Sequence, residues 1–157
     1  MRTILFVAAA ALVTSLNGTA QQSSHADGLA CFENLAAPEF PQAALHQHVD
    51  GSVWTWTHVN AQGIPEKIDT QVVSAWGDGP KLLIPPVEKA IHAAKVNPAC
   101  AGTTVSVVFR YELHGEAIAS PKVTSRNQAP NIMYIESQPE GGAVTTSKTS
   151  GKTSGRS

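Results

Sequence analysis

A stretch of alternating residues at positions 52–59, SVWTWTHV, limits most strongly what this chain can fold into. β-branched and aromatic residues alternate there, which is typical of a strand whose side chains point to opposite faces of a sheet. One face carries the β-branched residues: Val53, Thr55, Thr57 and Val59. Trp54 and Trp56 share the other face with His58. Three interpretations of that face are open. It is a contact site for a partner, it is covered by residues 118–135 or by Trp76, or it is the interface of a homodimer.

Turn residues and hydrophobic periodicity outline the other elements. A short helix begins at Pro41, a turn at residues 60–63 leads to a strand at 66–74, and a helix at 83–96 opens at Pro86. The last strand, at 103–113, has the clearest alternation, with these residues on one face: Val105, Val107, Phe109, Tyr111 and Leu113. We therefore expect an α+β fold with a small three-stranded antiparallel sheet and two helices on one face. Residues 132–135 are a candidate extra strand.

The beginning of the chain has the features of a secretory signal. Arg2 supplies a positive charge, residues 4–16 are mostly apolar, and Gly18 and Ala20 place small side chains before a cleavage site after Ala20. The apolar run is shorter than the roughly 20 residues that span a bilayer, so a membrane anchor is the less favoured alternative. We expect a periplasmic or secreted protein.

The rest of the chain divides by composition into four parts. Residues 21–37 form a flexible or extended lead-in, residues 38–115 one domain, and residues 116–140 a C-terminal extension. Residues 141–157 are rich in Ser, Thr and Gly and cannot bury enough apolar surface to fold, so we expect a disordered tail.

Charge and cysteine content narrow the partners and the compartment. The formal net charge is −1, so no strong field attracts nucleic acid, and we expect no nucleic-acid partner. Cys31 and Cys100 are the two cysteines. In an oxidising compartment such a pair predicts one disulfide; two free buried thiols are the alternative.

Groupings of residues that carry catalysis are not found in the sequence. None of the spacings GxSxG, HExxH or the P-loop occurs. His46 and His48 lie two positions apart on a predicted helix, so their side chains diverge and a simple shared metal site is excluded. We therefore expect a protein that is not an enzyme, with no catalytic residue, cofactor or metal.

Five short motifs occur in the order and at the spacing of the carboxy-terminal domain of TonB-type energy transducers, over about residues 38–113. They are Phe40-Pro41-x-x-Ala44, Gly51-x-Val53, Val59-Asn60-x-x-Gly63, Val96-x-Pro98-Ala99 and Val107-x-Phe109-x-Tyr111-x-Leu113. The chain resembles this family, and Cys100 after Pro98-Ala99 resembles a variant with a cysteine at that place.

The resemblance implies a binding domain that pairs the edge of its last strand with an extended peptide of an outer-membrane or envelope protein. The expected contact residues are Val105, Val107, Phe109, Arg110, Tyr111, Trp54 and Trp56. An alternative is a structural or oligomerising envelope module in which residues 131–136 fold back and close that edge. A third hypothesis is a membrane-tethered energy transducer. The resemblance also implies a link to TonB-dependent transport.

Overall fold

The computed structural model describes residues 25–26, 28–73 and 77–141. The expected signal at residues 1–20, Trp76 and residues 142–157 of the expected tail lie outside these ranges. The elements follow along the chain as β1 (His25–Ala26), η1 (Gly28–Cys31), α1 (Gln42–His46), β2 (Gly51–Val59), β3 (Pro65–Val73), α2 (Gly79–Ala93), η2 (Pro98–Cys100), β4 (Thr104–Leu113), β5 (Thr124–Gln128) and β6 (Ile132–Ser137).

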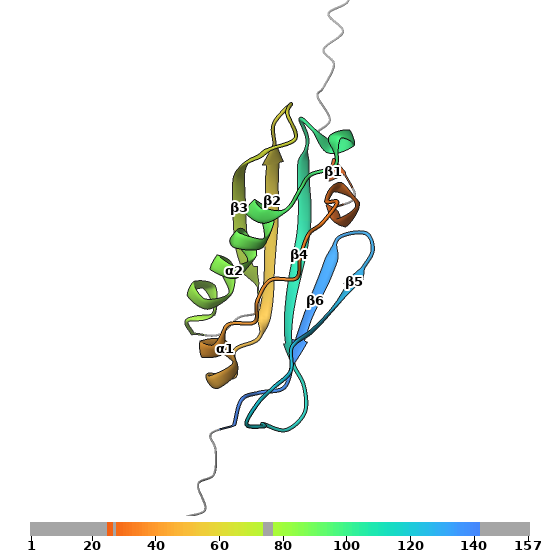
Figure 1. Cartoon of the computed structure of the whole chain (residues 1–157). Helices are drawn as coiled ribbons and strands as arrows, with labels where there is room; N and C mark the ends of the chain where they lie inside the picture. The colour runs from red at the N-terminus through yellow and green to blue at the C-terminus, as the bar shows by residue number, and fades with distance from the viewer. Residues whose placement is uncertain (1–24, 27, 74–76, 142–157) are drawn as a thin grey trace, which may run out of the picture.

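The sheet has five main strands in the order β3-β2-β4-β6-β5, and β1 pairs with the beginning of β4 (Figure 1). β2 runs antiparallel to both β3 and β4, whereas β6 runs parallel to β4 and antiparallel to β5. The α+β class is confirmed. The expected three-stranded antiparallel sheet is wrong, because residues 124–128 and 132–137 extend it into a mixed sheet.

Both helices lie over one face of this sheet (Figure 1). The core forms where α1 and α2 meet the residues of β2, β4 and β6 that point toward them. Its largest fully buried side chains include Phe40, Leu45, Leu83, Ile91, Phe109, Tyr111 and Ile135. Phe40 packs edge-on against Tyr111 with ring centroids 5.1 Å apart, a favourable geometry for two aromatic rings. The short α1 is held by this packing, because an isolated helix of that length is unstable.

Helix α2 begins at Gly79, earlier than the sequence pattern predicts. Pro80 occupies a position in the first turn, where a missing N–H costs nothing, and Lys81 pairs with Asp78 at 3.0 Å. Pro85 and Pro86 therefore lie inside the helix rather than at its start. The amphipathic stripe of Leu83, Val87 and Ile91 is fully buried and continues through the two prolines, which explains why the helix tolerates them.

The lead-in is attached to the domain from Gly28 onward. Phe32 bridges to Val96, and the N–H of Asn97 donates to the carbonyl of Cys31 at 2.7 Å. A Cβ at Gly28 would overlap the backbone carbonyl of Ser106 in β4, so only glycine allows this close approach. The lead-in consequently packs directly against β4.

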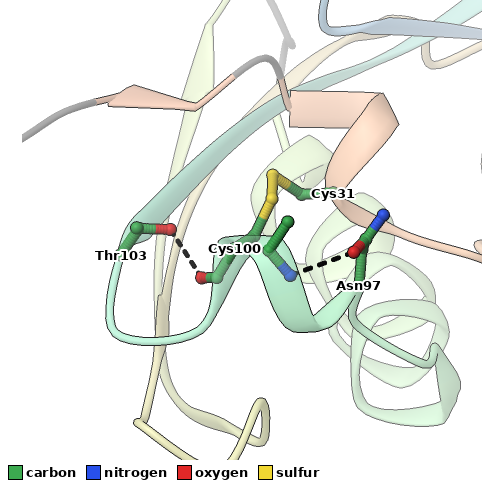
Figure 2. Close-up of a disulfide and its surroundings, with 5 residues drawn as sticks. Cys31, Asn97, Cys100 and Thr103 are labelled. Carbon is green, nitrogen blue, oxygen red and sulfur yellow. Dashed lines mark hydrogen bonds between the residues drawn. A yellow bond between two sulfur atoms is a disulfide. The ribbon is translucent and has the colours of Figure 1, made fainter.

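A disulfide joins Cys31 in η1 to Cys100 in η2, with Cα atoms 5.7 Å apart, as Figure 2 shows. This confirms the predicted pairing. The side-chain oxygen of Asn97 accepts the N–H of Ala99 at 3.0 Å, and the Thr103 hydroxyl donates to the carbonyl of Cys100 at 2.7 Å. These bonds fix the turn that presents Cys100. The disulfide between Cys31 and Cys100 is consistent with an oxidising extracellular or periplasmic location.

Candidate functional site: the open face of the sheet

The edge of β4, where a partner peptide was expected to pair, is occupied by the chain itself. β1 pairs with Thr104 and Val105, Gly28 lies against Ser106, and β6 pairs with residues 108–113. The expectation of an unpaired edge is therefore wrong. The alternative, in which the C-terminal segment folds back onto this edge, is the arrangement that the structure shows.

The side chains named for that edge are also mostly inaccessible. Those of the alternating set point into the core and are at most 1% exposed: Val105, Val107, Phe109 and Tyr111. Burial raises the pKa of the Tyr111 hydroxyl, which lies 3.5 Å from the carbonyl of Glu39. Arg110 alone among the named β4 residues points to the other side of the sheet and is exposed. The hydrophobic residues of β4 thus hold the fold together.

Trp54 and Trp56 alternate along β2 with the buried Val53 and Thr55, so they lie on the sheet face opposite the helices. Trp54 is 41% exposed, and the two indole rings are 6.3 Å apart with an angle of 42° between their planes. The expected cover by residues 118–135 is wrong, because β6 pairs with β4 and β5 pairs with β6, so both strands extend the sheet and do not lie over the tryptophans. We call this surface the open face.

The register of the strands assigns the other members of the open face. Trp54 lies opposite Gln71 of β3 and Val108 of β4, and Val108 in turn lies opposite Ile132 of β6. In the next row Arg110 of β4, Tyr134 of β6 and Arg126 of β5 lie side by side. The open face therefore combines three aromatic rings with two guanidinium groups on a surface formed by five strands.

Tyr134 packs between two arginines in this row. The guanidinium carbon of Arg126 lies 3.6 Å from the centre of the Tyr134 ring, and that of Arg110 lies 5.7 Å from it. Arg126 also bonds to the Glu136 carboxylate at 2.9 Å, and Tyr134 is only 8% exposed. Cation–π contacts of this kind are favourable, and they join β4, β5 and β6 on the open face.

His58 links three strands at one end of the open face. Its Nδ1 lies 3.0 Å from the Thr104 hydroxyl and its Nε2 lies 3.1 Å from the Asp69 carboxylate. Lys67 contacts the same carboxylate at 2.8 Å. The bond from Lys67 and then that from His58 lower the pKa of Asp69. A hydroxyl, an imidazole and a carboxylate in a row are the components of a nucleophilic site. In this row the Asp69 carboxylate is also paired with Lys67.

A second group of titratable residues lies at the opposite end of the open face. Single ligand atoms of Glu112, His114 and Glu136 lie within 4.8 Å of one another. Glu112 also pairs with Arg110 at 2.9 Å, and Glu136 with Arg126 at the same distance. Because each carboxylate already has a guanidinium partner, the negative charge that would attract a cation is balanced.

The two histidines near α1 contact the segment after β6. The ring of His46 lies 3.3 Å from the Glu140 carboxylate, and the ring of His48 lies 3.4 Å from the Glu140 carbonyl. Both contacts join the end of α1 to the segment after β6. The two side chains attach the C-terminal extension to the domain.

Sequence reasoning identified the β2 half of the open face but not the half formed by β5 and β6. Arg126 and the Tyr134 ring that it covers were missed as members of this face, although Tyr134 lies in a segment with alternating character. β5 reads TSRNQ, and all its residues are exposed. A strand with no apolar residue gives no periodic signal.

Comparison with family models, with curated proteins and with solved structures finds no match to this chain. Among the residues described by the structure, no helix is long and apolar enough to cross a membrane.

Proposed function

We propose that this protein is an exported, non-catalytic binding module that contacts a protein partner through the open face of its sheet. The single observation that carries the proposal is the exposure of Trp54 beside Trp56 on that face. Trp, Tyr and Arg are the residue types most enriched among those that dominate binding energy at protein interfaces. Trp54, Trp56, Tyr134, Arg110 and Arg126 bring all three types together.

The charges of the open face also suit such a partner. Lys67, Arg110 and Arg126 are each paired with a carboxylate of the same face. The aromatic centre thus has a polar rim in which these three cations are paired, and a polar rim is usual at protein interfaces. The order α1, β2, β3, α2, β4 is the one that the resemblance to TonB carboxy-terminal domains implies, and we propose a periplasmic partner on that ground.

Capture of partners from envelope extracts by the wild-type protein and by three variants tests this function. Trp54→Ala and Trp56→Ala should each weaken binding of the captured protein by about 30-fold or more, the effect of a central aromatic contact. Ile64→Ala is the control, because Ile64 is 58% exposed but lies in the turn between β2 and β3. Equal binding by all variants would contradict the proposal.

A second candidate function is strand addition to β4 after β6 is displaced. Two observations favour it: β4 and β6 pair in parallel, which is slightly less stable per residue, and β5 is exposed along its whole length. Deletion of the residues after Gly115 separates the two functions. Strand addition predicts that the truncated chain binds an extended peptide more tightly. If β6 closes the edge of β4 as a structural part of the domain, the truncated chain should instead be less stable than the wild type.

A further inference from the structure

A groove of about 570 Å³ lies on the helix side of the molecule, between residues 36–41 and helix α2. Helix α2 contributes one stripe to it: Leu82, Pro85, Pro86, Lys89, Ala90 and Ala93. The stripe spans eleven residue steps, about 16 Å at the rise of an α-helix. About five residues of extended chain have that length.

This stripe is separate from the one that α2 buries in the core. Leu83, Val87 and Ile91 are fully buried, whereas Pro85 and Ala93 of the groove are exposed. Proline and alanine side chains have almost no rotamer freedom to lose when a ligand covers them. The groove is therefore an apolar and rigid surface along a helix face that lies mostly outside the core, although Leu82 also packs against the core.

Two prolines remove the usual helical hydrogen-bond donors to the Leu82 carbonyl. In an α-helix this carbonyl would accept the N–H of residue 86, and in a 3₁₀-helix that of residue 85. Both positions are proline, which has no N–H. Leu82 lines the groove, so an N–H of a molecule bound there can take the place of the missing donor.

The opposite wall of the groove is an extended segment. Pro41, at its end, has φ −62° and ψ 134°. Among the described residues, Ala36 and Ala37 form no backbone hydrogen bond with any other residue, and both are exposed. This wall therefore presents backbone donors and acceptors to a second extended chain.

Lys89 and Glu39 are the charged residues of the groove, one on each wall. Neither forms an ion pair with another residue in the part of the chain that the structure describes. A ligand with one acidic and one basic group would complement both charges.

We propose that this groove binds an extended peptide segment of about five residues with small or proline side chains at its centre. An acidic residue of the peptide lies at Lys89, a basic residue lies at Glu39, and a peptide N–H donates to the Leu82 carbonyl. The groove is on the side of the sheet opposite the open face, so this site is independent of the function proposed above.

Titration of the isotope-labelled protein with two capped peptides, Glu-Ala-Pro-Ala-Lys and Lys-Ala-Pro-Ala-Glu, followed by NMR, tests the site. The amide signals of Ala36, Ala37 and Ala90 should shift with one of the two charge orders, and the indole signal of Trp54 should not. The uncharged analogue Gln-Ala-Pro-Ala-Gln should bind about fivefold more weakly. Absence of groove shifts with both charged peptides at millimolar concentration overturns the proposal.

Two matched pairs of variants test the individual contacts. Lys89→Glu should weaken the favoured peptide about fivefold or more, whereas Lys81→Glu, on the same helix but outside the groove, should not. Pro86→Ala supplies an N–H for the Leu82 carbonyl and should weaken binding about three- to tenfold. Pro85→Ala removes a similar part of the groove wall, but its new N–H points to the carbonyl of residue 81 and leaves that of Leu82 without a donor. The Pro85→Ala variant should therefore bind the peptide more tightly than the Pro86→Ala variant. Equal affinities within both pairs would overturn the assignment of these contacts.

Discussion

The N–H of Val108 donates to the carbonyl of Asn131 at 2.8 Å, and this bond begins the pairing of β6 with the edge of β4. The N–H of His114 donates to the carbonyl of Ser137 at 2.9 Å and ends it. Between these bonds β6 places Met133 and Ile135 in the core. The segment after residue 115 is therefore a structural part of the domain, and the backbone it covers is not free for a partner.

Replacement of Ile135 by Ala should destabilise the protein by about 2–5 kcal/mol, because the side chain is fully buried between β4 and the core. The free energy of unfolding in urea measures this change. Ser125→Ala, on the exposed strand β5, is the control and should change that free energy by less than about 0.5 kcal/mol. A loss at Ile135 as small as that of the control would mean that β6 is not packed as described.

Replacement of Gly28 by Ala should displace the lead-in from β4, since the new Cβ would overlap the Ser106 carbonyl. Overpacking of this kind costs about 1–3 kcal/mol. Thermal unfolding of the variant should begin at a lower temperature than that of the wild type. Ala37→Ser, at an exposed position of the same segment, should leave the unfolding temperature unchanged. Equal unfolding temperatures for the wild type and Gly28→Ala would show that the lead-in does not pack on β4.

The part of the fold that sequence predicts best is the part with clear hydrophobic periodicity. The alternation in β2 and β4 and the turn at Gly63 identify the antiparallel strands and the hairpin. The pairing of Cys31 with Cys100 follows from the predicted export. These features are local or compositional, so a single sequence can reveal them.

The remainder depends on contacts between distant residues. β6 contains the apolar residues Met133 and Ile135, but its parallel position beside β4 follows from a long connection that no local pattern specifies. β5 has only polar residues, and its pairing with β6 provides its place in the sheet. The open edge was therefore wrongly predicted from the order of elements, and the open face was only half recognised.

Replacement of Cys31 and Cys100 together by Ala should lower the free energy of unfolding by about 4 kcal/mol, the entropic effect of a closed loop whose ends are 69 residues apart. Urea unfolding with and without reductant measures this loss. Reductant should destabilise the wild type by a similar amount and have no effect on the double variant. Equal stability of oxidised and reduced wild type would contradict the role of the bond.

Acidification should remove the contribution of Asp69 to stability. Lys67 and His58 lower its pKa from the ordinary value of 3.8, so the unfolded chain binds a proton more readily than the folded one. Stability from this group is present above pH 3.8 and is lost as the pH falls through the lower folded pKa. Between pH 5 and pH 2 the wild type should therefore lose slightly more stability than Asp69→Asn. The reverse order in acid-unfolding curves would contradict the sign of the shift.

Amide hydrogen exchange at Val108 tests the central claim most directly, because its N–H reports the bond that begins the closed edge of β4. If β6 seals that edge and leaves the open face for a partner, this amide should exchange only through global unfolding, with the free energy measured in urea. Exchange through a local opening that requires several kcal/mol less than global unfolding would show that β6 is released in the native protein. The edge of β4 would then be available to a partner strand, which would contradict its closure by β6.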